Sequence, residues 1–144
     1  MLASAGFEVI VFHIDSVSDR THPTWDVVKE TISERAHVIG YLPLNIGDCA
    51  SVIRAAEVDV LVFPEVGMDP ITYFLSYSRL APVQVAWLGH PDTTGVRGMD
   101  YFLGSDIEPP EAKTKYSEKL VRMSNIGQFL CIFYVYVTYH LYHL

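Results

Sequence analysis

Clustered basic residues are missing from this sequence, and cysteine is scarce. The chain carries 10 Lys and Arg against 17 Asp and Glu, which gives a formal net charge of -7. A nucleic-acid groove needs a basic stripe that neutralises phosphates, so this composition argues against nucleic acid as a partner. The two cysteines, Cys49 and Cys131, have neither CxxC spacing nor a dense cysteine framework around them. We therefore expect two reduced thiols in an intracellular protein.

The common short catalytic signatures are also absent. No GxSxG, HExxH, GxGxxG or Walker-type loop occurs. Hydrolase, zincin, dinucleotide-binding and P-loop functions therefore lack their signatures. Six histidines are present, but none pair at ligand spacing on an expected helix face, and His140 and His143 belong to an unusual C-terminal tail. The pattern predicts no metal site.

What the sequence does contain is typical of one folded domain. Half of its residues are apolar and 19% are charged, a balance that favours a globular body over disorder. The expected strands are short apolar runs rich in β-branched and aromatic residues, at 7–14, 37–43, 58–63, 83–89 and 99–106. The expected helices are 22–36, about 49–56 with Asp48 as N-cap, 69–82 with Asp69 as N-cap and Pro70 in the first turn, and a last one from about Glu111.

Strands that alternate with helices predict an α/β fold, a Rossmann-like and mostly parallel sheet with flanking helices. Binding sites in such sheets lie outside the carboxyl ends of the strands. Two polar segments, "PEVGMDP" (64–70) and "GHPDTTG" (89–95), each follow an expected strand. We therefore expect both segments at the edge of the sheet where sites are built. The candidate substrate-binding residues are Glu65, His90, Pro91, Asp92, Thr93, Thr94 and Gly95.

Each of these candidates also has a plain structural interpretation. His90 either donates a proton or contacts a phosphate or sugar, or it hydrogen-bonds the backbone of the turn. Thr93 and Thr94, like the aspartate before them, supply turn hydrogen bonds in either case. Gly95 provides a positive φ or a close approach to a ligand. Glu65 is either a carboxylate of the site or a solvated turn residue.

The C-terminal tail departs from the pattern of the rest. No Asp, Glu, Lys or Arg follows Arg122, and "QFLCIFYVYVTYHLYHL" is almost wholly apolar or aromatic. Its Tyr and His content and the lack of flanking positive charge argue against a membrane span. The tail is either a strand pair, a segment that seeks a sheet edge, or a stretch not native to the domain, and we favour the last. We therefore divide the chain into a Rossmann-like domain, 1–126, and an apolar tail that we interpret as non-native, 127–144.

Three stretches together carry a resemblance to a known family. They are "FPEVGMDPITYFLSYSRLAPVQVAWLGHPDTTG", "MDYFLGSDIEPPEA" and "YSEKLVRM", and they cover roughly residues 58–123. In order and spacing they resemble the catalytic region of the protein O-linked N-acetylglucosamine (O-GlcNAc) transferases and their bacterial and plant relatives. That family has two facing Rossmann-like lobes, the GT-B arrangement, preceded by tetratricopeptide repeats. The resemblance implies that this chain is a fragment of the first lobe.

The resemblance also implies an activity and its partners. The family transfers N-acetylglucosamine from UDP-N-acetylglucosamine to Ser or Thr hydroxyls of proteins, with inversion and without a metal or other cofactor. The expected partners are the UDP-sugar donor, protein acceptors, the second lobe and the upstream repeats, with no nucleic acid and no membrane. The first residues lack the basic region of a signal peptide, so we expect a cytoplasmic or nuclear location.

Several features limit what the resemblance assigns. The second lobe, which holds most uridine and diphosphate contacts and an essential lysine, has no match here, so the catalytic residues are unknown and the isolated chain is expected to be inactive. Animal members usually have Tyr-Pro-Gly-Thr-Ser-Gly where this chain has His90–Gly95, which leaves the acceptor open. The main alternative is a non-catalytic Rossmann-like binding or interaction module. A sugar-nucleotide epimerase of GT-B type fits the fold but not the "WLGHPDTTG" signature.

Overall fold

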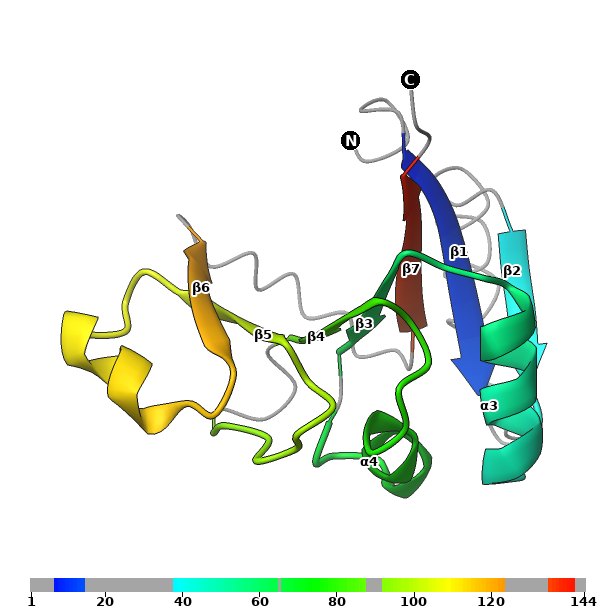
Figure 1. Cartoon of the computed structure of the whole chain (residues 1–144), viewed down its shortest axis with the longest axis horizontal. Coiled ribbons are helices and arrows are strands. Elements are labelled where there is room, and N and C mark those ends of the chain that lie inside the picture. The colour runs from blue at the N-terminus through cyan, green and yellow to red at the C-terminus, as the bar shows by residue number, and fades with distance from the viewer. Residues whose placement is uncertain (1–6, 15–37, 65, 88–91, 124–134, 142–144) are drawn as a thin grey trace, which may run out of the picture.

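A computed structural model describes residues 7–14, 38–64, 66–87, 92–123 and 135–141 of the chain (Figure 1). Its elements, in chain order, are β1 (Phe7–Ile14), β2 (Val38–Leu42), α3 (Ile46–Ala55), β3 (Val60–Phe63), α4 (Pro70–Ser76), β4 (Val83–Ala86), β5 (Tyr101–Ser105), the 3-10 helix η2 (Pro110–Lys115), β6 (Lys119–Met123) and β7 (Val135–Leu141). The helix predicted at 22–36 lies outside the described residues.

The strands form one sheet in the order β2-β1-β7-β3-β4-β5-β6. The pairs β1–β2, β3–β4, β4–β5 and β5–β6 are parallel. Only β7, among the described strands, runs antiparallel to its neighbours. The prediction of a mostly parallel α/β sheet with flanking helices is therefore confirmed. The short apolar runs explain it, because strands covered on both faces do not need alternating polar residues.

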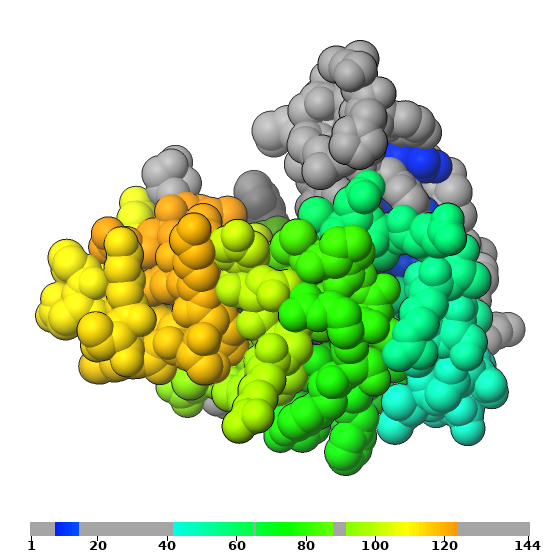
Figure 2. All heavy atoms as spheres, in the orientation of Figure 1, coloured from blue at the N-terminus to red at the C-terminus, as the bar shows by residue number. Residues whose placement is uncertain are grey.

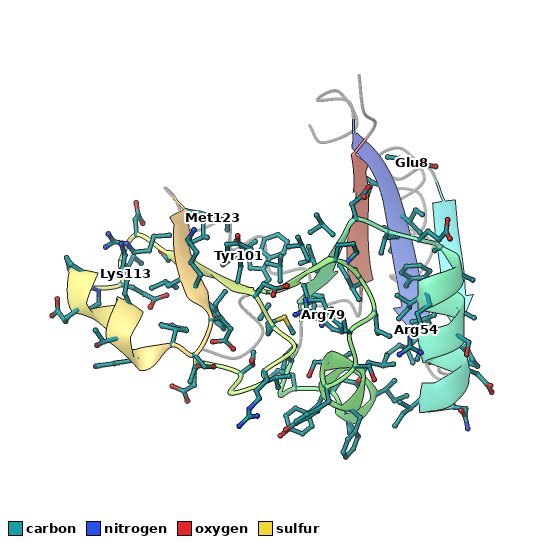
Figure 3. All side chains as sticks on the ribbon, viewed as in Figure 1. Glu8, Arg54, Arg79, Tyr101, Lys113 and Met123 are labelled. Carbon is teal, nitrogen blue, oxygen red and sulfur yellow. The ribbon has the colours of Figure 1, made fainter. Side chains whose placement is uncertain are left out.

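The core lies where α3 and α4 pack against the sheet (Figure 3). Six of its largest side chains, each at most 1% exposed, come from β2, β3, β5 and both helices: Leu42, Ile53, Leu61, Phe63, Leu75 and Phe102. Figure 2 shows α3 and α4 side by side on one face of the molecule. This packing sets the positions at which the segments after the strands leave the sheet.

The helix boundaries follow their caps. The Asn45 side chain accepts the N–H of Asp48 at 3.1 Å, so α3 begins at Ile46. The prediction of Asp48 as the N-cap was wrong, because Asn45, three residues earlier, offers the same kind of acceptor. Asp69 caps α4 as predicted, accepting the N–H of Thr72 at 2.8 Å.

The ends of two predicted helices differ from the structure. The helix that opens at Asp69 stops at Ser76 and does not continue to residue 82. The last predicted helix is instead η2 followed by strand β6, which pairs with β5 so that Leu120 lies opposite Phe102. All five residues of Lys119–Met123 pair in parallel with Tyr101–Ser105 of β5, and this ladder decides the conformation.

The C-terminal tail contributes β7 to the interior of the sheet. Val137 pairs with Val11 of β1 on one side and Val62 of β3 on the other. The alternative that the tail seeks a sheet edge is therefore wrong, because it is bordered by strands on both sides (Figure 1). That the tail is not native to the domain stays a prediction. Within the described ranges, no helix has the length and apolar character needed to cross a membrane.

Candidate functional site

The carboxyl ends of β3 and β4 lie side by side and define the edge where a site is expected. The N–H of Trp87, directly after β4, donates to the carbonyl of Phe63 at the end of β3, at 2.9 Å. Trp87 therefore continues the ladder at the carboxyl edge. Its position agrees with the expectation that "WLGHPDTTG" starts on the rim of the sheet where parallel α/β folds bind ligands.

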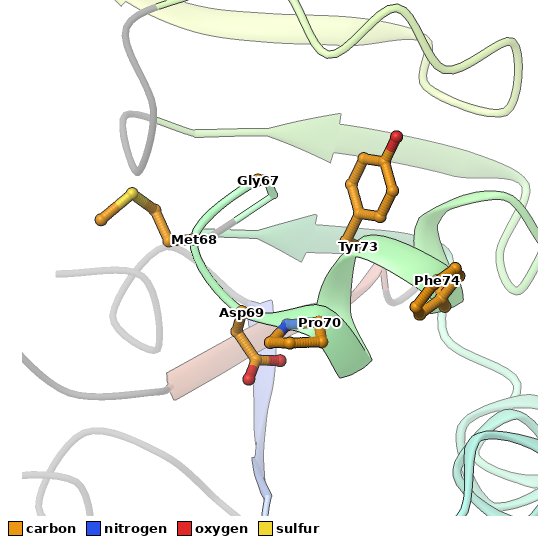
Figure 4. A pocket seen from close by; sticks show the side chains of 6 residues that line it. All are labelled: Gly67, Met68, Asp69, Pro70, Tyr73 and Phe74. Carbon is orange, nitrogen blue, oxygen red and sulfur yellow. The ribbon is translucent and has the colours of Figure 1, made fainter.

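The segment after β3 forms a shallow pocket at this same edge (Figure 4). It measures about 300 Å³ and is lined by Gly67, Met68, Asp69, Pro70, Tyr73 and Phe74. Gly67 has a φ of 94°, in the left-handed region that favours glycine, and it turns the chain toward α4.

The pocket is apolar and aromatic in character. Met68 and Phe74 are 63% and 55% exposed. The Tyr73 hydroxyl lies 2.6 Å from that of Tyr77 one turn later, and their rings meet edge to face with centroids 5.2 Å apart. The Asp69 carboxylate is already used as the cap of α4. Such a surface suits the apolar face of a ligand, with few polar groups to fix its orientation.

The sequence predicted that "PEVGMDP" (64–70) lies at this edge of the sheet, but it gave none of the six pocket residues as a candidate for binding. Exposed apolar side chains leave no periodic signal when they sit in a loop and on a seven-residue helix. The signal that could have found them is the cluster of Met, Phe and Tyr directly after a buried strand. Of the candidates predicted from the sequence, Glu65, His90 and Pro91 lie outside the described residues.

The rest of the "GHPDTTG" segment lies at the opposite end of the strands. The Thr94 N–H donates to the Glu118 carboxylate at 2.9 Å and the Thr93 hydroxyl at 2.7 Å. Glu118 directly precedes β6, whose first residue pairs with the first residue of β5. The expectation that the whole segment lies outside the carboxyl ends was therefore wrong for Thr93 and Thr94. A loop that leaves β4 at its carboxyl end has to return to the amino end to start a parallel β5.

The other candidates of this segment have simpler positions. Gly95 has a φ of 66°, which confirms the expected positive φ, and a Cβ built there would meet nothing within 4 Å. Asp92 is exposed.

Tyr116 lies near the carboxylates of this region, and its pKa is raised. Burial and a hydrogen bond with Glu108 raise the pKa of Tyr116 to about 12, and the negative charges of Asp92 and Glu118 add to that rise.

Two carboxylates at the amino edge are held ionised by their partners. Burial would raise the pKa of Glu118, but hydrogen bonds from Thr93 and Thr94 outweigh it and lower that pKa. Arg79 (labelled in Figure 3) forms a bidentate ion pair with Asp100. Its Nη1 lies 2.5 Å from Oδ2 and its Nη2 lies 3.0 Å from Oδ1. This bond lowers the pKa of Asp100, to which the Gln84 N–H also donates.

The depressed pKa values predict a loss of stability in acid. A carboxyl group whose pKa is lower in the folded state stabilises the fold above its unfolded pKa, and this contribution disappears as pH falls through the folded value. We expect the free energy of unfolding to fall steadily below the ordinary values of 4.5 for Glu and 3.8 for Asp. Urea unfolding at pH 7, 4 and 3 measures it. Glu118→Gln should show a smaller acid loss than the unaltered chain, and equal losses would contradict the assignment.

No group of three His, Cys, Asp or Glu side chains in the described ranges is arranged to hold a metal ion. Metal-independent chemistry stays a prediction.

Comparison with known families decides which class of protein this is. Residues 11–141 match the model of glycosyl transferase family 41. The chain belongs to glycosyl transferase family 41. The matched range contains β3, β4, β5 and β6, and so it includes both the carboxyl edge beside Trp87 and the Glu118 contacts. The resemblance to the O-GlcNAc transferases is confirmed, and with it membership of a glycosyltransferase family.

Several relatives support this assignment. The SPINDLY protein of Solanum lycopersicum, named "Probable UDP-N-acetylglucosamine–peptide N-acetylglucosaminyltransferase", is 40% identical over 83 residues, 57% of this chain and 9% of that protein. A UDP-glucose:protein N-beta-glucosyltransferase of Actinobacillus pleuropneumoniae serotype 7 (strain AP76) is 36% identical over 103 residues, 70% of this chain and 16% of that protein.

A solved structure supports the family 41 fold as well. A mutant of the O-GlcNAc transferase from Thermobaculum terrenum superimposes with a TM-score of 0.66 at 28% identity, covering 86% of this chain and 22% of that one. The family 41 chain described here thus spans 9% of the Solanum relative and less than a quarter of the solved structure.

Proposed function

We propose that this chain is part of a UDP-N-acetylglucosamine-dependent glycosyltransferase that adds N-acetylglucosamine to Ser or Thr hydroxyls of proteins, with inversion and without a metal. The observation that carries the proposal is the family 41 match over residues 11–141. The Solanum relative supports the choice of donor by its name. The Actinobacillus relative is named for UDP-glucose, so a test of the donor includes both nucleotide sugars.

In this proposal the carboxyl edge of the sheet forms one wall of the cleft. Trp87 and the pocket beside Gly67 and Tyr73 line that wall. An apolar wall excludes water and presents a surface to a sugar ring or an acceptor side chain. Departure of a diphosphate leaving group needs preorganised cations or N–H donors, which we assign to the second lobe. Further proposed partners are protein acceptors and upstream repeats, with a cytoplasmic or nuclear location for the complete protein.

A graft tests the proposal on an intact enzyme. Residues 58–123 of this chain replace the corresponding stretch of the Thermobaculum terrenum O-GlcNAc transferase, and this protein is called the graft below. We expect the graft to transfer labelled N-acetylglucosamine from UDP-N-acetylglucosamine to a protein acceptor, within about 100-fold of the host enzyme, because a misplacement of about 1 Å costs roughly that much. Transfer is measured by mass spectrometry of the acceptor.

The control is the unaltered host enzyme, assayed with the same acceptor and both donors. A cooperative thermal transition of the graft, followed by circular dichroism, establishes that it is folded, and calorimetry measures UDP binding by the unchanged second lobe. A graft that binds UDP but transfers no sugar would favour the non-catalytic module. A graft that prefers UDP-glucose would make the donor assignment wrong.

A further inference from the structure

The Glu118 carboxylate accepts several hydrogen bonds from a segment that is far from it in sequence. Its side chain is 5% exposed. One carboxylate oxygen accepts the Thr94 N–H at 2.9 Å and also the Thr94 hydroxyl, and the other accepts the Thr93 hydroxyl at 2.7 Å. Ser117, the preceding residue, donates its N–H to the Thr93 hydroxyl oxygen at 3.0 Å. We call Ser117, Glu118, Thr93 and Thr94 the clamp.

The clamp requires an ionised acceptor. The Thr93 hydroxyl, the Thr94 hydroxyl and the Thr94 N–H all donate to the Glu118 carboxylate. Hydrogen bonds to a charged acceptor are about twice as strong as those between neutral groups. A glutamine of the same shape would turn an NH₂ group toward one of these donors and leave it unsatisfied. The carboxylate is therefore specific for this arrangement and not merely a polar residue that fits the space.

The hydroxyl groups that made Thr93 and Thr94 candidates for substrate binding are already hydrogen-bonded within the clamp. Their oxygens are engaged with Ser117 and Glu118, and the Thr94 hydroxyl also accepts the Val96 N–H at 3.1 Å. What the two residues supply is the position of their segment. Val96 is 2% exposed, so the chain beyond the clamp is fixed by the core.

The two described ends of this segment are both tied. Trp87 is held at the carboxyl edge by its bond to Phe63, and Thr93 and Thr94 are held at the amino end of β6 by Glu118. Releasing the second tie would leave Trp87 and the wall beside it restrained from one side only.

We propose that Glu118 is a positioning residue for glycosyl transfer: by holding Thr93 and Thr94 it restrains the far end of a segment whose first described residue, Trp87, lies on the substrate-facing edge. The inference rests on the proposed function. Glu118 touches no substrate in this account and acts through the segment it holds. It therefore affects the turnover rate, while binding of UDP, assigned to the other lobe, does not depend on it.

Asp100 provides a matched control. It is a carboxylate that directly precedes β5, as Glu118 precedes β6, and it accepts hydrogen bonds from Arg79 and Gln84. Among the described residues, its side chain is hydrogen-bonded to Arg79 and Gln84 and not to Thr93 or Thr94. Asp100→Asn therefore removes a comparable anchor at the same edge without touching the clamp.

The experiment compares Glu118→Gln and Asp100→Asn in the graft. We expect both variants to lower the melting temperature to a similar extent, with UDP affinity unchanged. Glu118→Gln should lower kcat by about 10- to 100-fold, as expected for a displaced wall of the site, and Asp100→Asn by less than about threefold. Thr94→Val should lower kcat in the same direction as Glu118→Gln, whereas Thr94→Ser, which keeps the hydroxyl, should not.

If Glu118→Gln and Asp100→Asn lower kcat to the same extent for a similar loss of melting temperature, the inference is overturned, because the role of Glu118 is then structural only. A folded Glu118→Gln graft with full kcat would also overturn it. An inactive unsubstituted graft that binds UDP would instead overturn the proposed function, and with it any role of Glu118 in transfer. The unsubstituted graft thus separates the two failures.

Discussion

We expect the purified 144-residue chain to transfer no sugar from UDP-N-acetylglucosamine to a protein acceptor. Of all the predictions, this one involves the largest change in reaction rate. None of the six residues that line its pocket is basic, and the one carboxylate among them caps α4. Nothing in that pocket can stabilise a departing diphosphate, a contribution worth several orders of magnitude in rate. The matched stretch is 9% of the Solanum relative, and we assign this stabilisation to a part of such a protein outside the match.

Radiolabel transfer to an acceptor protein measures this prediction, with the graft assayed beside the isolated chain. We expect the rate of the isolated chain to equal that of a reaction without enzyme, at least about 10⁶-fold below a working enzyme. Sugar transfer above that background by the 144-residue chain alone would contradict the prediction, and would mean that one lobe carries the chemistry.

Replacing Gln84 by Leu should have the largest effect on stability. Gln84 is 0% exposed, and its amide accepts the Leu80 N–H at 2.7 Å and donates to the Gly98 carbonyl at 2.8 Å. Leucine fills a similar volume but leaves two backbone groups without partners, one of them in a residue that is 6% exposed. An unsatisfied buried group costs about 1–3 kcal/mol, so we expect a loss of about 2–5 kcal/mol.

Urea denaturation followed by circular dichroism measures the change. The control is Arg97→Leu, at an exposed position of the loop between β4 and β5. This substitution should change the free energy of unfolding by less than about 0.5 kcal/mol. A loss below about 1 kcal/mol for Gln84→Leu would mean that the Leu80 and Gly98 groups find other partners, and that Gln84 does not brace the loop between β4 and β5.

Local features of the sequence predicted most of the sheet. Runs such as "FEVIVFHI" and "VLVF" are apolar and β-branched, and they form β1 and β3. The cap and proline at Asp69 and Pro70 predicted the start of α4, since both act within one turn of the chain. The run "EAKTKYSEKLVRM" was taken for a helix that starts after two prolines. Pairing with β5, a contact distant in sequence, decides its conformation.

The site was harder to predict because its contacts join distant parts of the chain. Thr93 and Thr94 follow a strand in sequence, yet their partner is Glu118, which comes 25 residues after Thr93 and 24 after Thr94. Glu118 lay inside a stretch that was predicted as a helix and that carried part of the family resemblance, and the sequence assigned it no role of its own. The place of β7 between β1 and β3 likewise depends on pairing between the two ends of the chain. Periodicity and capping rules describe neighbours within a few residues, and so they miss such contacts.

A crystal structure of the graft with UDP-N-acetylglucosamine bound tests the central claim most directly, namely that the carboxyl edge of this sheet is one wall of a sugar-transfer cleft. We predict that the donor sugar or the acceptor hydroxyl lies against that edge, in contact with Trp87 or with the pocket at Gly67–Pro70. A donor and acceptor that touch this lobe only at the amino edge beside Glu118, or not at all, would contradict it.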